Sequence, residues 1–187
     1  MELDVGQPLL LVPGEGEVVG DSAERRVEIL CERDELHVTW TRLGPGRDGA
    51  DLHVHRRHAD LFYVLAGELT VRLAEGETVV PAGTLVYVPP LVVHGFRNAG
   101  DAELRYLNVH APGTGFADYL RGRNPGFDQE PPPADGVRPS SDAVVVPAGT
   151  TGVLVERDEI RVEIGTGTGR PACVLPFDDG RAIELYA

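Results

Sequence analysis

The sequence predicts an all-β fold, an antiparallel sandwich or barrel, and three observations indicate it. The 187 residues include 23 glycines and 15 prolines, which interrupt the chain at short intervals and favour short strands over helices. Apolar residues recur at every second position in several runs, as Leu36, Val38 and Trp40 do. A convincing helical pattern occurs only in the short segment 115–121.

The expected elements can be placed in order along the chain. Residues 35–40 alternate between apolar and polar, whereas residues 61–65 are apolar throughout, as in a strand covered on both faces. The alternating run 69–73 follows a Gly-Glu turn. Further strands are expected at 84–88, 92–96 and 103–109, and the helix follows the last of them.

Composition divides the chain into three parts. Residues 1–121 form the expected barrel domain, residues 122–142 a proline-rich linker or strap, and residues 143–187 a C-terminal β extension. The extension repeats a segment of the barrel domain, because residues 153–162 align with residues 29–38 and share the sequence Glu-Arg-Asp-Glu. We interpret both copies as a strand–turn–strand unit, which adds strands to the same domain or to a partner subunit.

Charge excludes several partners. Seventeen basic residues, all of them arginine, oppose 30 acidic ones, for a net charge of −13. This balance argues against nucleic acid or an anionic membrane as the main partner, and the lack of lysine excludes Schiff-base chemistry. The acidic N-terminus, Met1–Val5, does not look like a signal peptide, so a cytoplasmic location is expected. Cys31 and Cys173, each beside apolar residues, are expected to be buried reduced thiols.

Three histidines and an aspartate have the spacing of metal ligands. His53 and His55 stand two residues apart, so on a strand both side chains point to one face. Asp60 follows, and His94 comes from a distant strand. Three imidazoles and a carboxylate that converge inside a barrel suit a divalent Fe, Mn, Ni or Zn ion. The alternative is a set of histidines that only hydrogen-bond a bound organic ligand or water.

Around these residues the chain resembles the cupin superfamily. The first cupin motif is matched by His53-x-His55-x4-Asp60-x6-Gly67, and the second by Gly83-x5-Pro89-x-Leu91-x2-His94-x3-Asn98. The resemblance implies a double-stranded β-helix, or jelly-roll barrel, which is often dimeric and binds metal through its motif residues. It also implies that His53, His55, Asp60 and His94 are the ligands; otherwise Asp60 orients a ligating histidine.

Three features depart from the motifs, and one of them is the opening glycine, which is out of register because Gly46 and Gly49 flank its expected position. Asp60 replaces the usual glutamate, so its carboxylate is expected to fall about 1 Å short of the metal, and a glutamate there to bind metal at least as well. Leu91 replaces a glycine, and because leucine is costly at positive φ, this loop is expected to differ.

Other polar residues receive weaker assignments. His58 is expected at the surface, and His37 is expected to be exposed or hydrogen-bonded. Asn108 and His110 share a strand face and are not placed in the site. The pair Arg56-Arg57 either steers an anionic substrate or, more simply, pairs with carboxylates. The cavity walls are expected to include the side chains Trp40, Phe62, Val64, Tyr87 and Tyr106.

Three classes of function remain open. The first is a metal-dependent enzyme, either a quercetinase-like dioxygenase or an isomerase or lyase, in which Asp60 is the candidate catalytic proton acceptor because an acid in an apolar cavity often has a raised pKa. The second is a non-catalytic protein that binds a small-molecule ligand. The third is a structural role. We expect a homodimer in which terminal strands extend a sheet shared between subunits.

Overall fold

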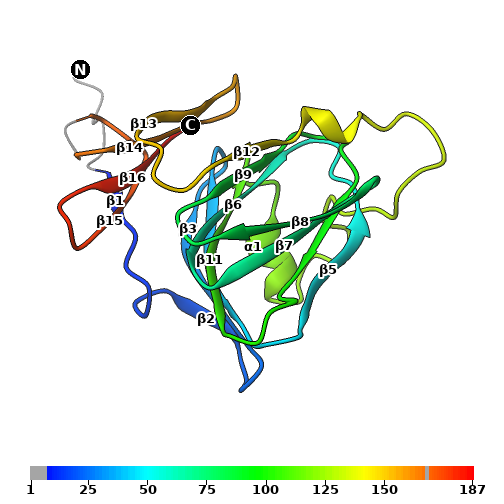
Figure 1. The fold of residues 1–187 in the computed structure, drawn as a ribbon, viewed down its shortest axis with the longest axis horizontal. Coiled ribbons are helices and arrows are strands. Elements are labelled where there is room, and N and C mark those ends of the chain that lie inside the picture. Colours follow the sequence, from blue (N-terminus) through cyan, green and yellow to red (C-terminus); the bar gives the residue numbers. More distant parts are fainter. Residues whose placement is uncertain (1–7, 167–168) are drawn as a thin grey trace.

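Three stacked β-sheets form the part of the chain that the computed structural model describes, residues 8–166 and 169–187 (Figure 1). The predicted all-β class is confirmed, with one short α-helix, α1 (Phe116–Leu120), inside the segment predicted to be helical. The acidic residues 1–5, in which no signal peptide is expected, lie outside the described residues. No helix in the described ranges is long and apolar enough to cross a membrane.

Two of the sheets face each other and enclose the barrel interior. The larger sheet has the order β12-β9-β6-β11-β4-β3-β2 and the smaller one β5-β10-β7-β8. The strands of the larger sheet are β2 (Glu17–Asp21), β3 (Arg25–Glu32), β4 (His37–Leu43), β6 (Ala59–Ala66), β9 (Leu85–Val88), β11 (Leu104–Ala111) and β12 (Val144–Val146). Those of the smaller sheet are β5 (Asp48–His53), β7 (Glu68–Leu73), β8 (Gly76–Pro81) and β10 (His94–Arg97).

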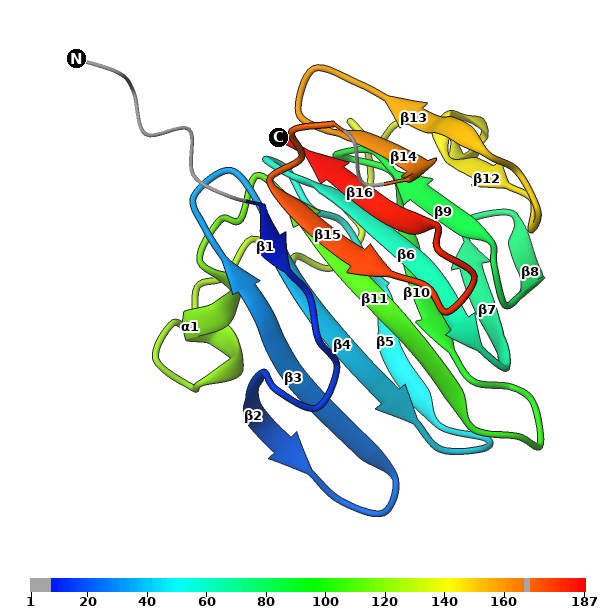
Figure 2. The same cartoon turned by 90° about the vertical axis from the view of Figure 1, so that its left-hand side faces the viewer.

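The third sheet, built mainly from the C-terminal residues, covers the outer face of the larger one (Figure 2). Its order is β1-β15-β16-β14-β13, and its strands are β1 (Leu9–Leu10), β13 (Gly152–Glu156), β14 (Arg161–Gly165), β15 (Cys173–Pro176) and β16 (Ala182–Tyr186). β1 pairs with β15 in parallel, so a segment from near the start of the chain joins the C-terminal sheet.

Strand β6 shows why the sequence is apolar at successive positions there. Leu61 and Tyr63 belong to the core between the larger sheet and the C-terminal sheet. Phe62 and Val64 belong to the core inside the barrel. Because side chains alternate across a strand, a strand covered on both faces must be apolar on both. This prediction is confirmed, and the alternation directs Asp60 into the barrel with Phe62.

The predicted repeat is visible as two matching hairpins. β3 and β4 pair with an irregularity in register between Ile29 and Cys31, and β13 and β14 pair with one between Val153 and Val155. These positions correspond in the alignment of residues 29–38 with residues 153–162. The two segments therefore form the same bulged strand–turn–strand unit.

The loop before β10 differs from its prediction. Leu91 has a φ of 69°, the left-handed conformation that a glycine would favour, so the expectation that leucine changes this loop is wrong. Two backbone hydrogen bonds hold the residue: its N–H donates to the carbonyl of His55 at 2.7 Å, and its carbonyl accepts from the N–H of Arg138 at 2.8 Å. The expected strand 92–96 begins only at His94.

Residues 122–142 run along the barrel. Glu130 forms an isolated bridge with Val54, and Arg138 forms one with Val92. After this strap (residues 122–142), β12 pairs with β9 of the same barrel. The domain boundaries and the homodimer stay predictions.

Cys31 and Cys173 are free and buried, as predicted. Their Sγ atoms lie 3.3 Å apart, between β3 of the barrel and β15 of the C-terminal sheet.

Candidate metal centre

The four predicted ligands meet at one end of the barrel interior. His53 ends β5 and His94 begins β10, and the two residues are direct partners in the antiparallel pairing of these strands. His55 lies two residues after His53, and Asp60 is the second residue of β6. All four side chains are buried, and one ligand atom of each lies within 4.8 Å of the others.

The distances between these atoms are those of neighbouring ligands around one ion. The Nε2 atoms of His53 and His55 lie 3.2 Å apart. Oδ2 of Asp60 lies 3.3 Å from Nε2 of His94 and 3.6 Å from Nε2 of His55. Atoms bound to one ion at about 2.0–2.2 Å are separated by similar distances. The expected shortfall of about 1 Å at Asp60 is therefore not seen.

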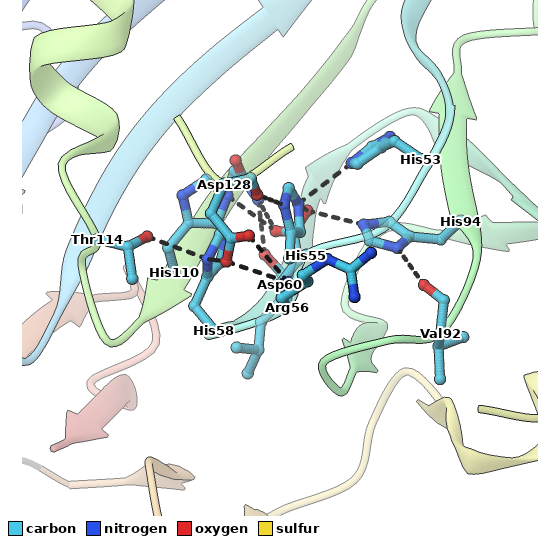
Figure 3. A network of polar contacts seen from close by, with 12 residues as sticks. His53, His55, Arg56, His58, Asp60, Val92, His94, His110, Thr114 and Asp128 are labelled. Carbon is cyan, nitrogen blue, oxygen red and sulfur yellow. Dashed lines mark hydrogen bonds and ion pairs between the residues drawn. The ribbon is translucent and has the colours of Figure 1, made fainter. Parts of the chain in front are cut away.

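Backbone carbonyls hold the opposite nitrogen of each histidine. Nδ1 of His53 lies 2.6 Å from the carbonyl oxygen of Asp51, and Nδ1 of His94 lies 2.9 Å from that of Val92. Nδ1 of His55 contacts the carbonyl oxygen of Asp128 in the same way (Figure 3). A carbonyl only accepts, so each ring has its proton on Nδ1 and a lone pair on Nε2. Three lone pairs and a carboxylate thus converge on one point.

Asp60 is ionised in this environment. Burial alone would raise the pKa of its carboxyl, but the nearby His110, which donates from Nε2, together with the adjacent rings of His55 and His94, outweighs burial and holds the pKa well below its usual range. Asn108 also donates from Nδ2 to Oδ1 of Asp60. The raised pKa expected of a catalytic proton acceptor is therefore wrong, because polar rings rather than apolar walls surround the carboxylate.

Burial keeps His53 neutral. It lowers the pKa of this histidine to about 3, and the nearby His94 and His55 add to the effect. The neutral imidazole is the form that binds a metal ion.

A cavity of about 660 Å³ adjoins three of the four residues. His53, His55 and Asp60 contribute to its wall, together with the aromatic rings of Phe96, Tyr106, Phe116 and Tyr119. Of the five expected wall residues, Tyr106 lines this cavity, and Phe62 and Val64 pack in the barrel core. Trp40 and Tyr87 face the C-terminal sheet instead, because they lie on the other face of their strands.

Three histidines are placed differently from their predictions. His58 is 1% exposed, so the surface position expected for it is wrong. His37 is also buried, with 2% of its surface exposed. Neither ring nitrogen of His37 has a hydrogen-bond partner among residues 8–166 and 169–187, so His37 is neither exposed nor hydrogen-bonded. His110 lines the cavity, as does Asn108. Their shared strand face was the signal in the sequence that pointed to them.

No pattern in the sequence indicated a role for the strap at this site. Phe127 packs against the rings of His55, His58 and His110, with centroid distances of 5.3–5.7 Å. The Asp128 carboxylate accepts hydrogen bonds from the backbone N–H groups of Arg56 and Arg57.

The pair Arg56-Arg57 is engaged with carboxylates, which agrees with the simpler of its two interpretations. Nε of Arg56 lies 2.8 Å from Glu130, and Nε of Arg57 lies 3.6 Å from Asp128.

Comparison with known proteins gives the context of this site. Residues 39–110 match the family model of the cupin domain. Over 120 residues the chain is 30% identical to quercetin 2,3-dioxygenase of Bacillus subtilis (strain 168), a match that covers 63% of this chain and 35% of that enzyme. The chain thus spans about a third of the curated relative's length.

Solved structures are also similar. An uncharacterized protein with a double-stranded β-helix domain from Klebsiella pneumoniae shares 28% identity, with a TM-score of 0.45 over 50% of this chain and 82% of that one. A predicted oxalate decarboxylase from Thermotoga maritima shares 18% identity, with a TM-score of 0.49 over 55% of this chain and 97% of that one.

Proposed function

Because this chain belongs to the cupin superfamily, with its cupin domain at residues 39–110, we propose that its barrel binds a divalent transition-metal ion for small-molecule chemistry. The ligands would be the Nε2 atoms of His53, His55 and His94 and the carboxylate of Asp60. We further propose that the reaction is a dioxygenation of a small enolic or catecholic molecule.

One observation supports the metal above all others. Backbone carbonyls hold the Nδ1 atoms of three histidines, so their Nε2 lone pairs face one another and the ionised Asp60 in a buried space. Lone pairs that face each other at 3.2 Å repel unless a cation lies between them. The donor set of imidazoles and one carboxylate suits Fe, Mn, Ni or Zn.

The residues of this chain would each have a defined task. The carbonyls of Asp51, Val92 and Asp128 orient the imidazoles, as partners of ligating histidines commonly do. Asp60 supplies negative charge and, with its low pKa, acts as a ligand rather than as a proton acceptor. A bound ion would act as a Lewis acid toward an oxygen atom of the substrate.

The cavity favours a flat, oxygen-bearing substrate. Its volume of about 660 Å³ is within the usual range for small-molecule sites. Aromatic rings of Phe96, Tyr106 and Phe116 form part of the wall, and the donors and acceptors of Asn108 and Gln129 form another part. Aromatic side chains pack well against planar rings. The dioxygenase in the proposal is also supported by the 30% identity to the Bacillus enzyme.

Metal binding and oxygen chemistry are tested separately. The full chain is stripped with a chelator and reloaded with one equivalent of Fe²⁺, Mn²⁺, Ni²⁺ or Zn²⁺, and affinity is measured by calorimetry. We expect His53→Gln to weaken binding at least tenfold. His37→Gln, which removes a buried histidine outside the ligand set, is the matched control and should bind like the wild type.

Oxygen uptake is then followed with a panel of flavonols, catechols and enols. We expect uptake with a redox-active ion and none with Zn²⁺, which has no redox chemistry. Tight metal binding without any oxygen uptake would refute the dioxygenase but not the metal site. Failure to bind any of the four ions would refute both.

A further inference from the structure

A second group of buried histidines lies beside the first. One nitrogen atom each of His55, His58 and His110 lies within 4.8 Å of the others. The ring centroids are 4.1 Å apart for His55 and His58 and 4.7 Å apart for His58 and His110. Figure 3 shows His55 between the two groups, with His53 and His94 on one side and His58 and His110 on the other. His58 and His110 are not among the residues that match the two cupin motifs.

Two nitrogens of this second group lack a protein partner. Nε2 of His58 and Nδ1 of His110 are buried and have no hydrogen-bond partner in the described part of the chain. Leaving a buried polar atom without a partner costs free energy, so these two nitrogens indicate a ligand that bonds to them.

The opposite nitrogens of the same two rings face carboxylates. Nδ1 of His58 lies 3.2 Å from Oδ2 of Asp128 and 3.0 Å from the hydroxyl of Thr114. Nε2 of His110 lies 3.4 Å from Oδ1 of Asp60. A carboxylate behind an imidazole fixes its proton and raises the basicity of the other nitrogen, and this arrangement is common in histidines that bind metals. The unpartnered nitrogens, Nε2 of His58 and Nδ1 of His110, therefore each have a lone pair available for a metal ion.

We propose that His55, His58 and His110 form a second cation site, for an imidazole-preferring divalent ion such as Zn²⁺, beside the first. His55 belongs to both groups, but its Nε2 can bond only one ion at a time. When both are filled, His53, His94 and Asp60 remain for the first ion, which is a complete set of two histidines and one carboxylate. The second site has no carboxylate ligand, so it is the weaker of the two.

Zn²⁺ stoichiometry of the full chain tests this proposal. The protein is stripped with a chelator, titrated with Zn²⁺ in a calorimeter, and analysed for metal after gel filtration. We expect two ions per wild-type chain, and one in His58→Gln and in His110→Gln. His37→Gln removes a buried histidine that also lacks hydrogen-bond partners among the described residues but lies outside both groups, so it should retain two.

The proposal rests on the proposed function only through the shared His55, and His53→Gln separates the two. That variant should lose the first ion and keep the second. If His53→Gln lost metal while His58→Gln and His110→Gln bound as much as the wild type, the first site would stand and the second would be overturned. One ion in the wild type would overturn the second site, and so would two ions that persist in both His58→Gln and His110→Gln, because these would be adventitious ions on the acidic surface.

Anomalous diffraction from Zn²⁺-soaked wild-type crystals covers the case in which a variant does not fold. A peak bounded by His58 and His110, distinct from one bounded by His53 and His94, supports the proposal. A single peak at the first site overturns it.

Discussion

His37 should make the stability of the metal-free protein depend on pH. Burial lowers the pKa of this histidine to about 3, and the nearby His110 and Arg121 add to the shift. The unfolded chain binds a proton at His37 below about pH 6.5, whereas the folded chain does not until about pH 3. Stability is therefore greatest above pH 6.5 and is lost as the pH falls from there toward 3.

The size of the effect follows from the two pKa values. Between pH 7.5 and 5.5 the proton taken up by the unfolded state lowers the free energy of unfolding by about 1.4 kcal/mol for this one histidine. His37→Gln removes the titrating group and keeps a polar side chain of similar length. The variant should therefore lose about 1.4 kcal/mol less than the wild type over this interval.

Urea unfolding of both proteins at pH 7.5 and pH 5.5, with a chelator present, measures this difference. Phe116→Leu is the control, because its ring packs 5.2 Å from that of His37 and the substitution changes packing without removing a titratable group. Its effect should be equal at the two pH values. An identical pH dependence in the wild type and His37→Gln would refute the reasoning, since His37 would then titrate normally in the folded protein.

Three further predictions concern other residues. Asp60→Glu should weaken metal binding about tenfold or more in a calorimetric titration, because Oδ2 is already 3.3 Å from Nε2 of His94 and an extra methylene displaces it. Tighter binding would mean that the aspartate is too short. At Leu91, with its φ of 69°, the glycine variant should be more stable to urea than the alanine variant by about 1 kcal/mol, the reverse of an ordinary position. A mild disulfide oxidant should join Cys31 and Cys173, whose Sγ atoms lie 3.3 Å apart, and raise the free energy of unfolding by about 2–5 kcal/mol. Finding two titratable thiols in the denatured, oxidised protein would contradict this.

The fold was predictable where the pattern of residues is local. The apolar run 61–65 indicated a strand covered on both faces, and β6 has one core on each side. The match between residues 29–38 and 153–162 indicated a repeated hairpin, and both hairpins have the same bulge. The loop at Leu91 was not predictable, because two backbone hydrogen bonds from distant parts of the chain hold the leucine in a conformation that its side chain disfavours.

The first group of histidines was likewise predictable from local spacing. His53 and His55 share a strand face, and the resemblance to the second cupin motif indicated His94 as a further ligand. In the structure His94 pairs with His53. The position of His58 in a polar turn predicts a surface residue instead. Its burial depends on the strap, about 70 residues later in the chain, which no periodicity connects to that turn.

The strap joins both histidine groups through a single residue. The carbonyl of Asp128 holds Nδ1 of His55, and its carboxylate lies 3.2 Å from Nδ1 of His58. The same carboxylate accepts from the N–H groups of Arg56 and Arg57, so the turn between the two histidines is fixed to the strap at several points. A proline-rich segment that composition marks as a linker therefore sets the ring orientation of a proposed ligand in each group. Because Asp128 lies outside the cupin domain at residues 39–110, the ring orientation of these proposed ligands depends on a part of the chain that the family motifs do not describe.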